Sequence, residues 1–193
     1  MSINLLETVQ KNLGYPLLHK IDPNTQDVFA DEKTPAEDKF SQAAIPAVLT
    51  AMYNYVQSDE GAAAFLQNES NTNWIGKIFD DKTKEAVQTI SSYALQSNAD
   101  PVLKMNEIAA EAVKVVKENI GEHADIKEVK LFFSNQINTI LLYLPAALHM
   151  GKLLQNDTLD DTTTKMEGPV SSLMKSIGSA FSTPVIDKEI KEQ

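Results

Sequence analysis

Apolar residues recur at spacings of three and four along most of this chain, which is typical of amphipathic α-helices. One stretch departs from that pattern, because residues 131–151 contain no Lys, Asp or Glu at all. A solvated helix carries a charged face, so a run of this kind indicates a helix that is buried on all sides. We therefore predict a central helix over residues 126–155, capped by Asp125 and kinked at Pro145, against which the other helices pack.

Start and stop signals divide the rest of the chain into further helices. Thr34 followed by Pro35 predicts the start of a long helix, and Pro46 inside this helix predicts a kink. Gly14 and Gly121 follow apolar-periodic stretches in the position of C-terminal caps. The predicted helices cover residues 3–13, 24–30, 35–57, 59–67, 74–79, 82–96, 101–120 and 168–181.

The sequence predicts no β-structure. No stretch alternates between apolar and polar residues as a half-buried strand does, and no Asn-Gly or Asp-Gly hairpin signal occurs. The expected fold class is all-α, with about eight or nine helices in a single bundle over residues 1–182. Residues 183–193 form a charged stretch that we expect to be a flexible tail.

Three short matches recur in the same order in the two halves of the chain, roughly residues 3–79 and 82–181. Collinear order is harder to obtain by chance than any single match, so the sequence suggests an internal duplication. We predict two related units with pseudo-twofold symmetry, in which Gly76 and Gly178 allow close helix approach. The matches pair Glu7, Val9, Gln10 and Tyr15 with Glu85, Val87, Gln88 and Tyr93; Pro46, Ala47 and Leu49 with Pro145, Ala146 and Leu148; and Ile75, Gly76 and Phe79 with Ile177, Gly178 and Phe181.

The composition argues against several classes of function. The chain has a formal net charge of −10 and no arginine, so all 17 of its basic residues are lysines. Recognition of phosphates and base edges relies heavily on the guanidinium fork of arginine, which makes nucleic acid an unsuitable partner. The chain also has no cysteine, which excludes disulfides and thiolate chemistry.

The apolar run over residues 131–151 is the one candidate for a membrane span. It contains Ser134, Asn135, Gln136 and Pro145, whereas a spanning helix needs about 20 mostly apolar residues. A buried core helix is therefore the better interpretation, and we expect no membrane span. The first residues show neither a basic region nor a small-residue cleavage site, so we expect no signal peptide and a cytoplasmic location.

No set of residues forms a recognisable catalytic or metal-binding motif. The histidines His19, His123 and His149 are not spaced like zinc ligands, and no phosphate-binding glycine loop or Gly-x-Ser-x-Gly motif occurs. An acidic loop that starts at Asp22 begins like a calcium loop, but it has Lys33 where a bidentate glutamate is required. We therefore expect no catalytic residue, no cofactor and no metal, and a protein that is not an enzyme.

Methionine and aromatic residues are concentrated in the second half of the chain. Adaptable apolar side chains of this kind suit the binding of varied partners. Filling of gaps in the core explains the same residues, and the sequence leaves both interpretations open. The residues of this possible apolar binding surface are Met105, Phe132, Phe133, Tyr143, Met150 and Met174.

Six segments carry a family resemblance: residues 3–6 with Gly14, 44–49, 58–63, 75–79 with Lys82, 144–152, and 177–178. These segments resemble the bacterial YidB-like family, a domain family of unknown function. The chain would be a divergent, glycine-poor member, since it has seven glycines. The resemblance implies no established activity and no functional residue.

The function that these observations favour is a non-catalytic helical interaction module, which binds a protein partner or another copy of itself. The alternative is a carrier of a small apolar molecule, with a cavity between the two proline-kinked helices.

Overall fold

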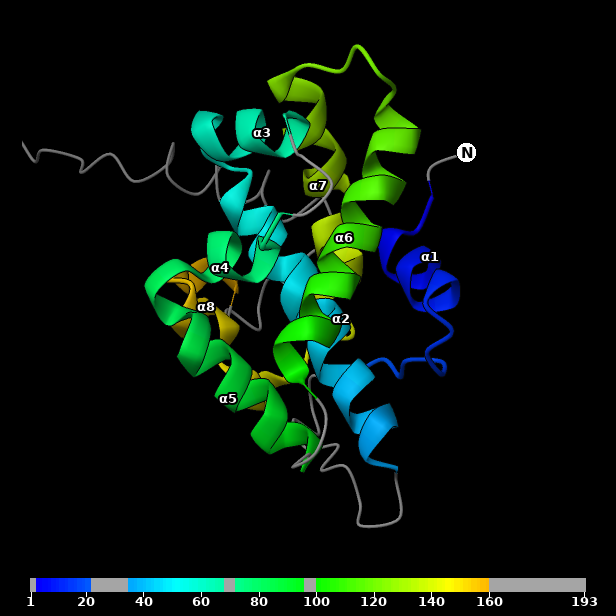
Figure 1. Cartoon of the computed structure of the whole chain (residues 1–193), viewed down its shortest axis with the longest axis vertical. Helices are drawn as coiled ribbons and strands as arrows, with labels where there is room; N and C mark the ends of the chain where they lie inside the picture. Colours follow the sequence, from blue (N-terminus) through cyan, green and yellow to red (C-terminus); the bar gives the residue numbers. More distant parts are fainter. Residues whose placement is uncertain (1–2, 22–34, 68–71, 96–99, 160–193) are drawn as a thin grey trace, which may run out of the picture.

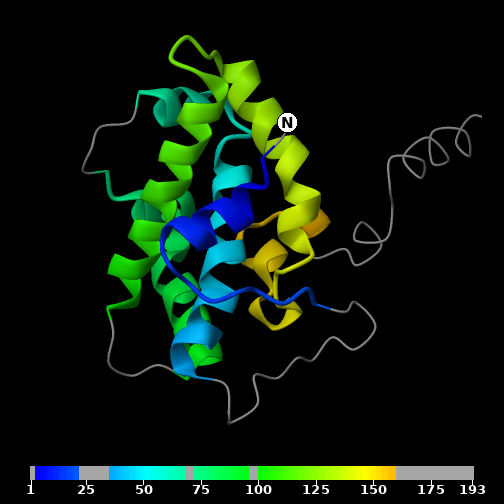
Figure 2. The same ribbon diagram turned by 90° about the vertical axis from the view of Figure 1, so that its right-hand side faces the viewer.

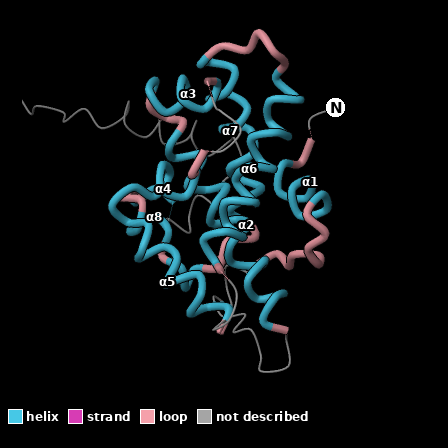
Figure 3. Tube along the Cα trace, in the orientation of Figure 1, coloured by secondary structure: helices cyan, strands magenta, loops and turns pink. Residues whose placement is uncertain are grey.

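The computed structural model of the chain describes residues 3–21, 35–67, 72–95 and 100–159. In these ranges the chain forms helices and connecting turns and no strand (Figure 3), which confirms the predicted all-α fold class. The predicted helices over 24–30 and 168–181 and the charged tail lie outside the described residues. The α-helices are α1 (Leu5–Asn12), α2 (Ala36–Tyr55), α3 (Asp59–Leu66), α4 (Trp74–Phe79), α5 (Thr83–Ala94), α6 (Pro101–Ile120), α7 (Ile126–Leu141) and α8 (Met150–Leu153).

Helix α2 is the central element of the bundle (Figure 1). Every residue from 43 to 52 is buried, so the helix has no solvent-facing side over about three turns. It packs against α1, α4, α5, α6, α7 and α8. The prediction that residues 126–155 form the central helix is wrong, because α2 has this role.

Helix α7 ends at Leu141 and does not continue through Pro145. Pro145 has a ψ of 126° and precedes a short 3-10 turn, Ala146–Leu148, so the prediction of a kinked helix at this proline is wrong. Proline lacks an N–H donor and disfavours helical backbone at the residue before it, which explains why the helix stops.

The bend after α7 also affects the candidate membrane span. Helix α7 and the segment Ala146–Leu153 are related by a bend of 113°. Within the described ranges, no single helix is both long and apolar enough to cross a membrane, and these two pass that test only as a bent pair.

Pro46 lies inside α2, as predicted. The Pro46 carbonyl accepts a hydrogen bond from the Thr50 hydroxyl at 2.7 Å, and packing on all sides holds the helix together across the proline. Pro46 and Pro145 therefore occupy different backbone conformations, although both begin a Pro-Ala-x-Leu sequence. The internal duplication stays a prediction, since Gly178 and its neighbours lie outside the described residues.

The signals at Asp125, Gly14 and Gly121 act where the sequence places them, whereas α2 begins one residue later than Thr34 predicts, with Pro35 as its N-cap residue and no side-chain cap. Asp125 forms a reciprocal capping box at the start of α7, and Asp100 and Ser58 cap α6 and α3 with their side chains. Gly14 and Gly121 follow α1 and α6 with φ angles of 70° and 86°. These elements form locally, and the burial of their apolar faces against α2 brings them together.

Helices α3 and α4 begin with the same arrangement, in which a capping side chain accepts a hydrogen bond from a glycine N–H three residues later. The Ser58 hydroxyl accepts from Gly61 at 2.9 Å, and the Asn73 amide oxygen accepts from Gly76 at 3.1 Å. A Cβ on Gly61 would overlap the Tyr55 carbonyl oxygen, whereas the nearest atoms to a Cβ on Gly76 belong to the Asn73 side chain. Gly76 therefore leaves room for a capping residue and does not serve the close helix approach that the sequence suggested.

Replacement of Gly61 by alanine should lower the free energy of unfolding by about 1–3 kcal/mol, because the overlapping atoms belong to the backbone and cannot move aside easily. The matched variant Gly76→Ala should lower the free energy of unfolding less, because only the Asn73 side chain must move; the weakened Asn73 cap is partly offset by the lower entropy of the unfolded chain. Thermal unfolding followed by circular dichroism measures both variants. Equal unfolding midpoints would contradict the overlap at Gly61.

Candidate functional site

Most residues of the possible apolar binding surface lie in the interior. Phe132 is half-buried and packs edge-on against Phe133, with the ring centroids 6.0 Å apart, and Met174 lies outside the described residues. A buried side chain cannot form an exposed surface, so the structure places the other four residues in the core. These buried residues are Met105, Phe133, Tyr143 and Met150, of which none is more than 8% exposed.

The first described residues of the chain, 3–21, pack against the bundle and are bound to it by hydrogen bonds to distant residues. The N-terminal segment, residues 3–21, consists of α1 and the extended stretch that follows it. Figure 2 shows this stretch crossing α2 on its way toward the end of α7. Helix α1 itself packs on α2, α6 and α7. The docking face is the set of residues that bind this segment by hydrogen bonds, namely Gln42, Glu111, Gln136 and Leu142.

Apolar side chains anchor α1 to the bundle. Leu5, Leu6 and Val9 are each at most 1% exposed, and their spacing places them on one face of the helix. Complete burial of one such side chain stabilises a contact by about 1.5–3 kcal/mol. These three residues therefore supply most of the free energy that holds the segment in place.

Gln136 binds the start of α1 through both ends of its amide group. Its Oε1 accepts a hydrogen bond from the Leu5 N–H, and its Nε2 donates to the Ile3 carbonyl, each at 2.9 Å. The first N–H groups of a helix have no partner within the helix, so Gln136 acts as a cap from 131 positions away. Asn4 completes this end by accepting from the Glu7 N–H.

Gln42 binds the extended stretch in the same way. Its Oε1 accepts from the His19 N–H at 2.8 Å, and its Nε2 donates to the His19 carbonyl at 3.0 Å. The same Nε2 donates to the Tyr143 carbonyl at 2.9 Å, and the Ile21 N–H donates to the Leu142 carbonyl at 2.8 Å. The last carbonyls of a helix lack intrahelical donors. At the end of α7, Gln42 and Ile21 supply donors to the carbonyls of Tyr143 and Leu142.

A tight turn joins α1 to the extended stretch. The Tyr15 N–H donates to the Gln10 carbonyl at 3.0 Å and the Gly14 N–H donates to the Lys11 carbonyl at 3.1 Å, which is the Schellman pattern. Glycine adopts the left-handed conformation that this turn requires without steric cost. The Gln10 side chain donates in return to the Tyr15 carbonyl at 2.6 Å. The two parts of the segment are thus connected by a well-defined turn.

Charged and polar side chains line the edge where the segment meets α2 and α6. Lys104 Nζ lies 3.3 Å from Glu37 Oε1 and 5.5 Å from the centre of the Phe40 ring. Further along α6, Glu111 accepts a hydrogen bond from the Asn12 amide at 2.8 Å. Exposed ion pairs contribute less than about 1 kcal/mol each, so this edge orients the segment more than it stabilises it.

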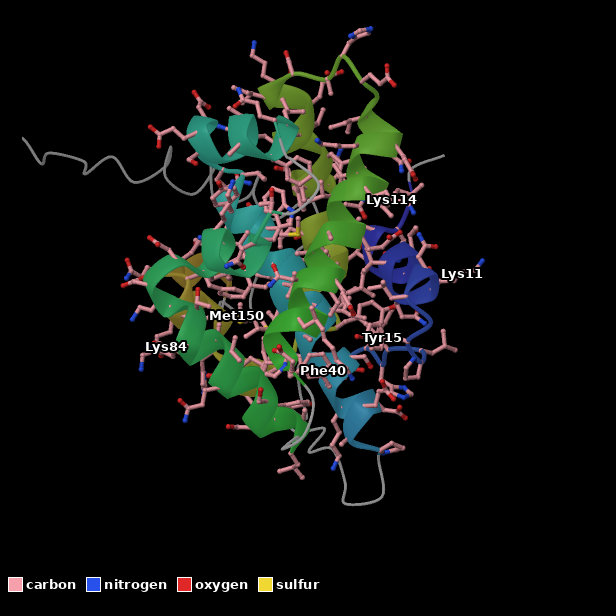
Figure 4. The ribbon with its side chains drawn as sticks, in the orientation of Figure 1. Lys11, Tyr15, Phe40, Lys84, Lys114 and Met150 are labelled. Atoms are coloured by element: carbon pink, nitrogen blue, oxygen red, sulfur yellow. The ribbon has the colours of Figure 1, made fainter. Side chains whose placement is uncertain are left out.

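Tyr15 lies at the same edge, on the side of the molecule opposite to Lys84 (Figure 4). Burial raises the pKa of the Tyr15 hydroxyl above its ordinary value of 10.0, and the nearby carboxylates of Glu107 and Glu37 raise this pKa further. The folded chain therefore favours the neutral hydroxyl.

The histidines do not come together in a site. His19 bonds to Gln42 through its backbone, and the side chains of His19, His123 and His149 are all exposed. Among the described residues, no group of three or more histidine, aspartate or glutamate side chains could hold a metal ion. The acidic loop that starts at Asp22 lies outside the part of the chain that the structure describes.

Comparison of the chain with protein-family models, with curated proteins and with solved structures found no match. The docking face and the segment that it holds therefore have to be interpreted from their own chemistry.

The sequence contains one signal for the two glutamines of the docking face, because each is an uncharged polar residue within a mainly apolar helical pattern. Gln136, for example, lies three residues after Phe133 and four before Ile140. A buried amide must find hydrogen-bond partners, so this position indicates a polar contact. It does not indicate which segment supplies the contact, because the partners are backbone groups that look alike at every position.

Replacement of Gln136 by leucine should lower the free energy of unfolding by about 1–3 kcal/mol, because the buried Leu5 N–H loses its acceptor. The Leu5 amide should also exchange its hydrogen faster. The matched control is Gln57→Leu, since Gln57 is exposed and its amide donates to the Tyr53 carbonyl one turn away. Urea unfolding and amide exchange measured by NMR should affect only the first variant, and equal effects would rule out the cap.

The raised pKa of Tyr15 predicts a loss of stability in alkaline solution. Below its ordinary pKa of 10.0 the hydroxyl is neutral in folded and unfolded chains alike, and the stabilisation is fully present. As the pH rises from there toward the folded pKa, only the unfolded chain ionises, so stability falls. Tyr15→Phe removes this ionisation, and its unfolding free energy should decline less than that of the wild type between about pH 9 and pH 11.

Ultraviolet absorbance of tyrosinate provides an independent readout. Glu107→Gln removes one of the two charges that raise the pKa of Tyr15, so this hydroxyl should ionise at lower pH than in the wild type. The difference between spectra with and without Tyr15→Phe isolates the signal. Parallel pH profiles of stability for Tyr15→Phe and the wild type would contradict the raised pKa.

Proposed function

We propose that the protein is a non-catalytic helical interaction module that binds a segment of a protein partner on the docking face. The observation that carries the proposal is the pair of glutamine side chains, Gln42 and Gln136, which bind residues 3–21 through main-chain atoms. Main-chain hydrogen bonds supply affinity for many sequences, and apolar contacts supply specificity, as in other modes of peptide recognition.

The chemistry of the docked segment defines the partner segment that would fit. It is a short helix with apolar residues at the spacing of Leu5, Leu6 and Val9, followed by a left-handed turn and an extended stretch. In the unbound chain the N-terminal segment occupies the docking face, and a partner segment of the same pattern replaces it.

The alternative function, a carrier of a small apolar molecule, has no specific observation in its favour. It requires two proline-kinked helices that enclose a cavity between them. Pro46 lies inside α2, but Pro145 lies in extended backbone before a 3-10 turn, so the second kinked helix is missing.

The proposal keeps three expectations that come from the sequence alone. They are the relationship to the bacterial YidB-like family, a cytoplasmic location, and a bundle of about eight or nine helices built from two related halves.

A synthetic peptide with the sequence of residues 3–21 tests the docking face directly. Leu17 is 80% exposed, so a dye attached to a cysteine in its place leaves the other contacts undisturbed. The protein for the titration is full-length Leu6→Asp, in which a charge replaces a buried leucine and loosens the chain's own segment. Fluorescence anisotropy should show saturable binding at least about tenfold tighter than to the wild type, whose tethered segment competes.

The matched control peptide has aspartate at the positions of Leu5 and Val9 and should not bind. Circular dichroism of the Leu6→Asp protein checks that the remaining helices are intact. If the native peptide shows no saturable binding, or binds no better than the control peptide, the docking face does not recognise segments and the proposal is wrong.

A further inference from the structure

The N-terminal segment is connected to the rest of the described chain through residues 22–34. Its contacts with the bundle are noncovalent and join distant parts of the sequence: Leu5 and Gln136 are 131 positions apart, and Asn12 and Glu111 are 99 positions apart. None of these contacts depends on the segment and the bundle belonging to the same molecule, and every other copy of the chain offers the same docking face.

We propose that the partner segment on the docking face is the N-terminal segment of a second copy of this chain. The inference rests on the proposed function above and names its partner. Two chains that exchange residues 3–21 form each contact twice, in a closed dimer with twofold symmetry. Each chain then contributes Leu5, Leu6 and Val9 to the core of the other, and neither docking face is complete without its partner.

The fit between segment and docking face is specific to this sequence. Leu5, Leu6 and Val9 are at most 1% exposed, so the bundle encloses these side chains completely, and Gln136 binds the backbone of Ile3 and Leu5 beside them. If the segment left, Leu5, Leu6 and Val9 and the apolar side chains that surround them would be exposed to water. The hydrophobic effect therefore favours renewed binding of a segment. The segment of a second copy meets every one of these requirements.

The connection is long enough for exchange. Residues 22–34 can span about 45 Å when fully extended. Helix α2, which the segment crosses, has 20 residues and is about 30 Å long. The maximum reach of the connection exceeds the length of α2, so chain length alone does not prevent the exchange.

Concentration and charge set the balance between the two arrangements. A tethered segment has an effective concentration on the order of millimolar, so exchange becomes measurable when the chain refolds at high concentration. The net charge of −10 on each chain opposes association, and salt screens this repulsion. The dimer fraction should rise with both protein and salt concentration.

The absence of cysteine from the chain permits a clean cross-linking experiment. Asn12→Cys and Glu111→Cys are made in separate chains, because Asn12 Nδ2 and Glu111 Oε1 lie 2.8 Å apart in the docked arrangement. The two variants are refolded together from urea at high concentration and treated with a short bismaleimide. We expect a product of twice the chain mass in the mixture, well above the amount formed by either variant alone.

Two controls accompany this experiment. A mixture of Asn12→Cys with Lys84→Cys measures random collisions, since Lys84 lies on the side of the molecule opposite to the segment (Figure 4). A single chain that carries both Asn12→Cys and Glu111→Cys checks that the reagent spans the pair. Light scattering of the wild type over a range of concentrations measures the dimer independently of any cross-link.

Product above the Lys84 background, together with a wild-type dimer that grows with concentration, would support the exchange. A wild type that stays monomeric throughout, or a dimer whose mixture yields only background product, would overturn it. The two proposals fail differently. If the labelled peptide binds the Leu6→Asp protein while the cross-link stays at background, segment binding stands and exchange between copies is wrong.

Discussion

A helix with no solvent-facing side imposes the main constraint on this molecule. Because α2 is buried around its whole circumference from residue 43 to residue 52, the rest of the chain has to surround it. Packing, more than intrinsic propensity, keeps such a helix intact across an internal proline. The need to cover α2 also bears on the part of the chain after α7. This part does not continue α7 as one helix; Ala146–Leu148 packs on α5, and α8 packs on α2.

The end of α7 and the N-terminal segment depend on each other. When the helix stops before Pro145, the carbonyls of Leu142 and Tyr143 need donors, and Ile21 and Gln42 supply them. When α1 starts, the N–H of Leu5 needs an acceptor, and Gln136 of α7 supplies it. Each element thus satisfies the unpaired backbone groups of the other, so neither end is complete in isolation.

Features set by neighbouring residues could be predicted from the sequence, and features set by distant contacts could not. The caps at Ser58, Asp100 and Asp125 depend on side chains within three residues, and their helices begin as predicted. The prediction that the charge-free run over residues 131–151 is buried on all sides is wrong, because Leu131 is 61% exposed and Ser134 and Asn138 are exposed as well. The run also does not distinguish a buried helix from buried turns. Leu144 and Leu148, for instance, are at most 3% exposed outside any α-helix.

The docking face could not be predicted from sequence patterns, for a related reason. Gln42 and Gln136 bind backbone atoms, and a backbone atom leaves no trace in the sequence of its partner. Likewise Pro46 and Pro145 share a local motif, yet one lies in a helix and the other does not. The two prolines differ in the packing around them, and this packing involves residues that are distant in the sequence.

The long separation between Leu5 and Gln136 has a consequence for the order in which the fold is completed. Residues 3–21 leave the ribosome before every helix that holds them, and their last partner on α7 follows 131 positions later. Contacts between such distant residues form late, since the intervening chain must first be ordered. The packing of α1 on α2 and α6 does not depend on α7, whereas the Leu5 N–H has no acceptor until Gln136 has been synthesised. The start of α1 is therefore the last part of the segment to be completed.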